Sequence, residues 1–467
     1  MTAGMFTRRE LIGAGALGLA GLSAGCAHLP GGASEDVFLD DVQRRTFRFF
    51  WETTNPAKGL ARDRYPTPSF ASMAAVGFAL TAYPIGAERG FVSRGEAAAR
   101  TLATLRFLWN APQGDAPRGM TGHKGFFYHF VDMQTGARFE QTELSTVDTA
   151  LLLGGMLFCQ SYFDRPSERE IHDLVERIYA RVDWRWSAAR PPTVALGWNP
   201  EKGFLPYDWI AYSEAMLVYL LAIGSPTHAL GSDAWEAWSA GLPKHWGMEE
   251  GYEHVRFGPL FGHQYSHIWV DFRGVKDAFM RGKGIDYHEN SRRATLAQHA
   301  YAVRNPGGWT GYGERLWGLT ACDGPADVTV PVKGRPRTFR SYSARGPADF
   351  DDGTVSPTAV GGSIPFAPDL CIPALKAMRE DHGANLYGEY GYFDSLNLTV
   401  PASVPLKHGR HVPGRGWYDG DYLGIDQGPI LAMIENHRSG LIWNVMRSNP
   451  HIRRGLTRAG FTGGWLG

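Results

Sequence analysis

The sequence has no surplus of charge of either sign. Its 467 residues include 47 basic and 47 acidic side chains, so the formal net charge is zero. A nucleic-acid-binding protein would normally carry a basic surplus, so this class is excluded. The chain is not disordered either, because 43% of its residues are hydrophobic and only 20% are charged, which is typical of a folded globular protein with a full core.

Cysteines and cofactor motifs are scarce. The chain has 4 cysteines, one of which is Cys26 in the N-terminal segment. The others show no Cys/His ligand spacing, so we expect no structural zinc site. A Gly-rich phosphate loop with lysine and a Gly-x-Ser-x-Gly nucleophile elbow are also missing from any suitable context. The sequence therefore predicts no metal and no cofactor.

Residues 1–33 have the character of an export signal. Residues 7–12 (TRRELI) form a twin-arginine pattern, followed by a Gly/Ala/Leu stretch that is too short and too weakly apolar to span a bilayer. Residues 22–26 (LSAGC) resemble a lipobox in which Cys26 would be lipidated, and an ordinary signal-peptidase cut is the alternative. We expect a protein exported by the twin-arginine route to the periplasm, with a lipid anchor if Cys26 is lipidated.

Residues 34–467 are dominated by helical patterns. Capping boxes at 93–96, 145–148 and 167–170 each precede apolar residues at helical spacing. Helices are predicted at 37–53, 70–83, 93–110, 145–163, 167–183, 211–223, 233–240, 290–304, 369–382, 428–446 and 450–459. Alternating strands are scarce, and 327–332 is the best candidate. Since no repeat and no linker is visible, a single domain is predicted.

Long irregular stretches are predicted between some of these helices. They cover residues 111–142, 185–210, 241–289, 305–368 and 384–427, and they hold most of the Trp, His and paired acidic residues. Loops of that length are uncommon unless they are functional. Aromatic-rich loops on a helical scaffold are typical of a deep polar groove that binds flat apolar ligand faces, including those of sugars.

Four carboxylates are candidates for chemistry. Glu140, Glu143 and Asp148 lie at one loop-to-helix junction, and Glu214 lies among aromatic residues where another helix is predicted to start. Hydrolysis of an acetal needs one protonated and one ionised carboxyl group. Asp148 is also explained by its capping box, and Glu140 by a solvated surface position. Glu143 and Glu214 have no such role in folding, so they are the preferred acid/base pair.

Polar and aromatic residues that suit sugar hydroxyls accompany these acids. The predicted substrate-binding residues, besides Glu140 and Asp148, are Tyr207, Trp209, Tyr265, His267, Trp269, Asp271, Arg273, Asn290, Arg292, Trp309, Trp317 and Asp323. His263 and His267 have the i,i+4 spacing of a zinc site, but no Glu follows His263, so a polar groove wall is preferred. Trp309 and Trp317 also fit core positions beside tight glycine turns.

Five segments together resemble the glycoamylase-like domain family, and within it the bacterial endo-β-1,2-glucanases of glycoside hydrolase family 144. The resemblance spans about residues 37 to 460, and its blocks are 143–152 (ELSTVDTALL), 264–273 (QYSHIWVDFR), 317–325 (WGLTACDGP), 357–368 (PTAVGGSIPFAP) and 422–429 (YLGIDQGP). It implies an all-α (α/α)6 toroid whose loops form a groove, without cofactor, acting on β-1,2-glucan with inversion.

The resemblance also implies roles for the two glutamates. Glu143 and Glu214 match the positions of the family's essential acids, and a related transglycosylase domain implies that Glu143 is the proton donor. The local sequence favours the reverse, because Tyr207, Trp209 and Tyr212 would raise the pKa of Glu214 and make it the acid. Both assignments stay open at this point.

The predicted function is an exported, monomeric, endo-acting glycoside hydrolase that binds a poly- or oligosaccharide and no nucleic acid. An exo-acting glycosidase that releases a disaccharide, or a transglycosylase, is the alternative, since these differ by loops at the ends of the groove. A non-catalytic glucan-binding lipoprotein is the alternative of another class, and the intact glutamate pair argues against it.

Overall fold

The structure is a computed structural model that describes residues 31–347 and 349–467. The twin-arginine pattern and Cys26 lie outside the described residues. The first helix, α1, begins at Gly31, inside the segment predicted to be the export signal. In the described part of the chain, no helix has both the length and the apolar character needed to cross a membrane.

Two kinds of helix alternate along the chain. Helices of the first kind are buried along almost their whole length and are called the inner helices: α2 (Met73–Glu88), α4 (Thr146–Tyr162), α7 (Met216–Gly224), α10 (Phe261–Trp269), α13 (Pro357–Gly361) and α15 (Gly424–Arg438). Helices of the second kind are half-exposed and are called the outer helices: α1 (Gly31–Thr53), α3 (Arg94–Asn110), α5 (Arg169–Arg181), α8 (Asp233–Ser239), α12 (Tyr287–Arg304) and α14 (Pro368–His382). Shorter helices complete the set: α6 (Trp184–Ser187), α9 (Leu242–His245), α11 (Ala278–Lys283), α16 (Leu441–Met446) and α17 (Pro450–Arg458).

The amino-acid pattern accounts for this alternation. Helix α5 buries Ile171, Leu174 and Ile178, which recur every three or four residues, while charged residues occupy its other face. Helix α7 reads MLVYLLAIG and is buried at every position. A helix with one apolar stripe packs on a core with that face only, whereas a helix that is apolar all round must be surrounded by other elements.

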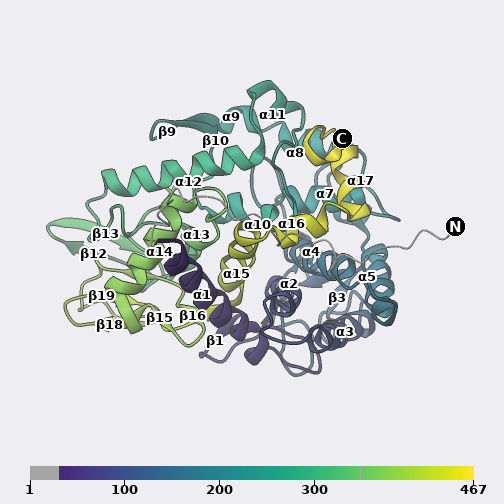
Figure 1. The fold of residues 1–467 in the computed structure, drawn as a ribbon, viewed down its shortest axis with the longest axis horizontal. Coiled ribbons are helices and arrows are strands. Elements are labelled where there is room, and N and C mark those ends of the chain that lie inside the picture. Colours follow the sequence, from purple (N-terminus) through teal and green to yellow (C-terminus); the bar gives the residue numbers. More distant parts are fainter. Residues whose placement is uncertain (1–30, 348) are drawn as a thin grey trace, which may run out of the picture.

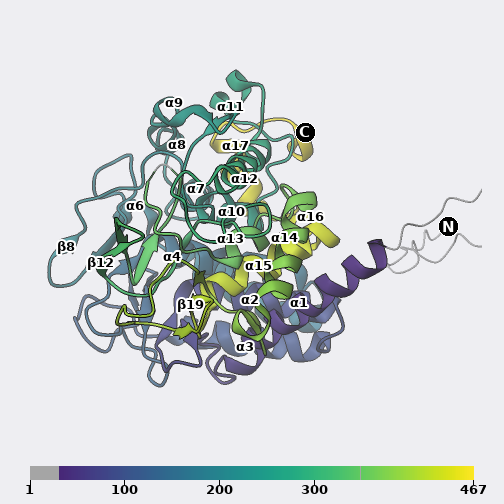
Figure 2. The ribbon, with the colours of Figure 1, turned by 90° about the vertical axis from the view of Figure 1, so that its left-hand side faces the viewer.

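The inner helices are neighbours of one another. Helix α2 packs against α4 and α15, α4 against α7, α7 against α10, and α15 against α10 and α13. Helix α10 is joined to α13 where the side-chain amide of Gln264 donates to the carbonyl oxygen of Ala359 at 2.8 Å. Helix α15, near the C-terminus, therefore lies beside α2, near the N-terminus, and the outer α1 packs against both (Figure 1, Figure 2).

Many short strands connect these helices. The largest sheet has the order β3-β4-β6-β7-β8. Its strands are β3 (Gly122–His123), β4 (Phe126–Tyr128), β6 (Leu144–Ser145), β7 (Gly197–Asn199) and β8 (Gly203–Phe204). The strand predicted at 327–332 is confirmed as β12 (Val328–Val332), which forms a hairpin with β13 (Arg335–Phe339).

The remaining strands are paired two or three at a time. Their bounds are β1 (Arg64–Tyr65), β2 (Ala71–Ser72), β5 (Phe130–Val131), β9 (Trp246–Glu249), β10 (Tyr252–Val255), β11 (Ala321–Asp323), β14 (Tyr342–Ala344), β15 (Tyr387–Gly388), β16 (Gly391–Tyr392), β17 (Leu396–Asn397), β18 (Arg410–Val412), β19 (Gly416–Tyr418) and β20 (Tyr422–Leu423). The helix-rich class is confirmed, but strands are more numerous than the sequence predicted. Most strands are too short to show an alternating pattern, so the sequence did not indicate them.

Some predicted boundaries are wrong. The stretches 241–289 and 305–368, predicted as irregular, contain helices α10 and α13. Helix α10 was missed because buried His, Gln and Ser residues interrupt its apolar pattern. The single helix predicted at 428–446 is divided between α15 and α16, since Gly440 between them has a φ of 68°.

The contact between α2 and α4 yields a stability prediction. A Cβ added at Gly155 would overlap the backbone carbonyl of Gly77, so Gly155→Ala forces the two helices apart. Overpacking of this kind costs about 1–3 kcal/mol in the free energy of unfolding, which denaturant titration measures.

Gly95→Ala is the matched control, because Gly95 lies in the exposed α3 and its nearest atom to an added Cβ is 3.9 Å away. This control should raise the free energy of unfolding by about 0.5–1 kcal/mol. Equal stability of the two variants would contradict the close packing of α2 and α4.

Candidate active site

Acidic residues gather at the N-terminal ends of the inner helices. Glu143 immediately precedes β6, which leads into α4, and Asp148 lies in the first turn of α4. Glu214 lies two residues before α7, and Asp426 lies in the first turn of α15. The N-terminal end of a helix carries partial positive charge, which favours a carboxylate there. The fold thereby brings together acids that are far apart in the sequence.

Glu143 is held in its ionised form. Its Oε1 lies 2.9 Å from Nδ1 of His129, and the backbone N–H of His129 donates to its carbonyl oxygen at 2.9 Å. Burial alone would raise the pKa of this carboxyl, but the hydrogen bond and charge of His129, helped by Arg138, bring its pKa below the ordinary value. Glu143 is therefore a carboxylate at neutral pH.

His129 lies between two carboxylates. Its Nε2 is 3.5 Å from Oδ1 of Asp148, and its ring stacks on Phe130 with 3.8 Å between ring centroids. Burial lowers the pKa of His129, but the charges of Asp148 and Glu143 outweigh burial and raise that pKa to about 9. The ring is therefore an imidazolium at neutral pH.

Asp148 is buried beneath this pair, with 4% of its surface exposed. Burial raises its pKa, and His129 and Ser145 offset part of that effect. Ser145 caps α4 by accepting a hydrogen bond from the backbone N–H of Asp148 at 3.1 Å. The Ser145 hydroxyl group in turn donates to the carboxylate of Asp148, so only half of the predicted capping box is formed through the backbone.

Glu214 has the opposite electrostatic environment to Glu143. Burial raises its pKa to about 7, the charge of Asp148 adds to this, and a backbone hydrogen bond offsets part of it. Glu214 as a whole residue is half-buried. Two carboxyl groups whose environments move their pKa values apart define an acid and a base.

The aromatic residues predicted beside Glu214 contribute unequally. Tyr212 is buried, whereas Tyr207 is 68% exposed. The indole N–H of Trp209 donates to the hydroxyl group of Thr146 at 2.9 Å, which ties this loop to the start of α4. The pKa of Glu214 is thus raised by burial in the fold and by the charge of Asp148. The exposed Tyr207 is not among the causes of this rise.

A second group of acids surrounds Arg64. The guanidinium of Arg64 donates to Oδ2 of Asp323 at 2.6 Å, and the backbone N–H of Asp323 donates to Oδ2 of Asp394 at 2.7 Å. Burial raises the pKa of Asp394 well above its usual range, and burial raises the pKa of Asp426 to about 7. The two carboxyls are hydrogen-bonded to one another, so one proton shared between them removes one of their two negative charges.

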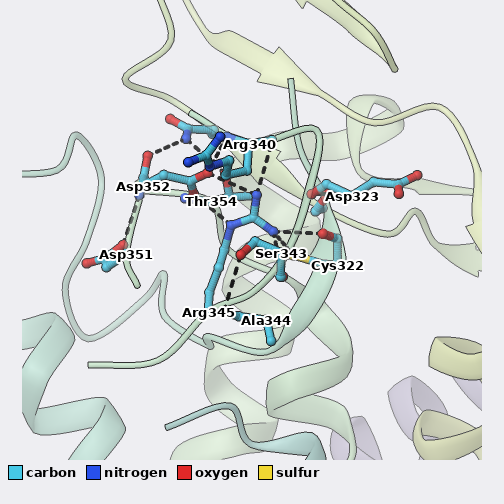
Figure 3. A network of polar contacts seen from close by, with 12 residues as sticks. Cys322, Asp323, Arg340, Ser343, Ala344, Arg345, Asp351, Asp352 and Thr354 are labelled. Carbon is cyan, nitrogen blue, oxygen red and sulfur yellow. Dashed lines mark hydrogen bonds and ion pairs between the residues drawn. The ribbon is translucent and has the colours of Figure 1, made fainter. Parts of the chain in front are cut away.

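A buried ion pair lies beside Asp323 (Figure 3). The Arg345 guanidinium donates to Asp352 at 2.7 and 2.9 Å, and neither side chain has any exposed surface. Arg345 also donates to the carbonyl oxygen of Cys322 at 2.7 Å, next to Asp323 in β11. The network fixes the strand that presents Asp323 to Arg64.

Several residues predicted to bind substrate are instead part of the core. His267, Trp269, Asn290 and Trp317 are all buried, with exposed fractions of 1% or less. Nε2 of His267 pairs with the hydroxyl group of Ser291 at 3.1 Å, and the indole N–H of Trp269 donates to Thr81 at 3.0 Å. These two contacts are internal, whereas the indole N–H of Trp317 and Nδ1 of His267 have no hydrogen-bond partner among the described residues.

Other predicted binding residues form ion pairs or hydrogen bonds within the protein. Asp271 is buried and pairs with both Arg273 and Arg447 at 2.9 Å. Arg292 is half-exposed and faces Glu289 at 3.6 Å. The indole N–H of Trp309 donates to Asp351 at 2.7 Å.

Tyr265 feels the charges of the acids, whereas Glu140 lies at the surface. Burial raises the pKa of Tyr265 well above its usual range, and the charges of Asp426, Glu214 and Asp148 add to this effect. Glu140 is exposed, with a φ of 47°, and lines a surface hollow. That hollow is shared with Pro117, Arg118, Gly119, Arg138, Gln141 and Glu201.

The sequence interpretation missed His129, Arg64 and Asp394. His129 is a single histidine without a motif, and its partners are distant in the chain. Asp394 contacts Asp323 across 71 residues. Only the fold brings these groups together.

The chain is similar to known proteins over most of its length. Residues 206–450 match the glycoamylase family model, described as "Putative glucoamylase". A protein from Bacteroides uniformis, whose crystal structure is described as that of a putative glucoamylase, is 31% identical to this chain. The two structures have a TM-score of 0.79 over 93% of this chain and 99% of that one. The endo-β-1,2-glucanase from Chitinophaga pinensis, in complex with sophorotriose and glucose, is 27% identical, with a TM-score of 0.76 over 92% of this chain and 99% of that one.

A curated relative from Parabacteroides distasonis is an exo β-1,2-glucooligosaccharide sophorohydrolase acting at the non-reducing end. It is 29% identical over 91% of this chain, and this chain spans 58% of the relative's length. The chain belongs to the glycoamylase family, whose named relatives here are glycoside hydrolases. The predicted family resemblance is confirmed.

The second acidic group yields a prediction about metal. One oxygen each from Asp323, Asp394 and Asp419 lies within 4.8 Å of the others, an arrangement of hard ligands that could hold a cation. We expect a strong chelator to leave hydrolytic activity intact, because Arg64 pairs with Asp323, and burial raises the pKa values of Asp394 and Asp419 well above their usual range, which favours protons over a cation. Loss of activity that calcium or magnesium restores would contradict this expectation.

Proposed function

We propose that the protein hydrolyses β-1,2-linked glucan. The observation that carries this proposal is the opposed environment of Glu143 and Glu214, one ionised and one protonated near neutral pH. Acetal hydrolysis requires that pair of states. The choice of β-1,2-glucan rests on the Chitinophaga and Parabacteroides relatives, whose names specify that linkage.

In the proposed mechanism Glu214 is the general acid. Its raised pKa keeps the proton that the leaving glycosidic oxygen must receive. Glu143, held ionised by His129, is the general base that removes a proton from the attacking water. Water then attacks the anomeric carbon on the face opposite the leaving oxygen, which inverts its configuration. This assignment adopts the local sequence interpretation and reverses the role that the family resemblance gave to Glu143.

Cleavage within the chain is the proposed mode, as in the Chitinophaga relative. Release of a disaccharide from the non-reducing end is the second candidate, because the curated Parabacteroides relative is named for that activity. The two modes differ in whether the polymer can extend past both sides of the cleaved bond.

The wider architecture is part of the same proposal. We infer that the six inner and six outer helices form one (α/α)6 toroid and that residues 34–467 are a single, monomeric catalytic domain. The alternation of buried and half-exposed helices supports this inference. The twin-arginine pattern supports export to the periplasm, and the lipobox-like segment supports a lipid anchor at Cys26.

The substrate proposal predicts a clear preference. Linear β-1,2-glucan should be cut much faster than β-1,3-glucan, β-1,4-glucan or starch, because the family relatives named for a substrate act on that linkage. Chromatography of early products measures both rate and mode: a ladder of lengths indicates internal cleavage, and disaccharide alone indicates the exo mode. Equal activity on starch would contradict the proposed substrate.

The acid/base pair predicts the behaviour of two variants. Glu143→Gln and Glu214→Gln should each keep the fold and lose about 10²–10⁴-fold or more in kcat, since each removes one proton transfer. Glu170→Gln is the control, because this exposed residue on α5 pairs only with Arg106 and should retain full turnover.

A substrate with a leaving group that needs no protonation separates the two roles. It should largely restore turnover of Glu214→Gln and leave Glu143→Gln inactive. Rescue of Glu143→Gln alone would exchange the roles. Near-normal activity of both variants on β-1,2-glucan would remove the pair from the mechanism.

A further inference from the structure

We propose that His129 is a positioning residue whose imidazolium ties Glu143 to Asp148 and keeps Glu143 ionised for its role as base. The inference rests on the proposed function because that function makes Glu143 the general base. The bridge, meaning the contacts of the His129 ring with Glu143 and Asp148, is present in the structure whatever the function. No sequence motif marks this histidine.

The position of the His129 ring is strongly constrained. Its backbone N–H donates to the Glu143 carbonyl oxygen at 2.9 Å, and its own carbonyl oxygen accepts from the backbone N–H of Met73 at 3.1 Å. The ring stacks on Phe130. With backbone and ring face both held, Nδ1 is directed to Glu143 at 2.9 Å and Nε2 to Asp148 at 3.5 Å.

This contact pattern favours a cation. A neutral imidazole has one N–H and could donate to only one of the two carboxylates, whereas an imidazolium has an N–H on each nitrogen. The titratable groups that act on the ring come from three segments: Asp148 of α4, Glu143 before β6, and Asp63 before β1. Arg138 acts on the Glu143 side, but the carboxylates dominate around the ring.

The bridge links the two catalytic carboxyls indirectly. On one side the imidazolium lowers the pKa of Glu143. On the other side it contacts Asp148, whose charge helps to raise the pKa of Glu214. Removing the positive charge should therefore raise the pKa of Glu143, so the base becomes protonated at a higher pH and the acidic limb of kcat/KM moves upward.

Two substitutions separate the two contacts. His129→Asn places an amide N–H near the position of Nδ1, facing Glu143, and His129→Gln places one near Nε2, facing Asp148. Both remove the charge, so both should shift the acidic limb to higher pH. We expect His129→Asn to retain at least tenfold more kcat than His129→Gln, because it still orients the base.

His451→Gln is the matched control. His451 is another buried histidine beside a glutamate, with Nε2 2.7 Å from Glu176, but it lies on α17 away from the acids. Its substitution should leave both limbs of the pH profile unchanged. A role limited to folding would lower kcat in the His129 variants without moving the acidic limb, and that result would overturn the proposal.

A direct titration tests the bridge without relying on activity. Histidine side-chain NMR of the full chain should show His129 protonated up to about pH 9 in the wild type, and a lower pKa in Glu143→Gln. Titration of His129 near its ordinary value of about 6.5 would overturn the inference, even if the His129 variants fail to fold. A raised pKa of His129 together with full activity of Glu143→Gln would instead refute the proposed base and leave the bridge standing.

Discussion

The structure depends on how buried carboxylates are balanced where the inner helices begin. Glu143 and Asp148 lie at the start of α4, Glu214 before α7 and Asp426 at the start of α15, and burial raises the free energy of each ionised form. A carboxylate there must find a cation, keep a proton or reach solvent. The different solutions adopted by neighbouring acids give the site its chemistry.

His129 and Arg64 supply the balancing charge on the two sides of the site. Glu143 is stabilised as an anion because His129 is adjacent, and Asp323 because Arg64 donates to it. Glu214 has no such partner in the described structure and feels the charge of Asp148, so it holds its proton to higher pH. Acid and base character thus follow from which carboxyl lies next to a cation.

The sequence predicted the helical scaffold well, because stripes such as that of α5 and caps such as Ser145 are local signals. It misread α10, in which polar residues face internal partners. Residues chosen as sugar-binding because they are aromatic or polar, such as Trp269 and Asn290, lie in the core, since composition alone does not distinguish a groove from an interior. The partnership of His129 with Asp148 could not be predicted, because it depends on tertiary contacts.

The pH dependence of kcat/KM on linear β-1,2-glucan tests the central claim most directly, namely that burial and Asp148 keep Glu214 protonated near neutrality. The account predicts that activity falls as pH rises through about 7, because the general acid then loses its proton. The same limb should disappear with a substrate whose leaving group needs no protonation. A rate that stays constant from about pH 6 to 9 on the natural linkage would contradict the assignment of Glu214 as the acid.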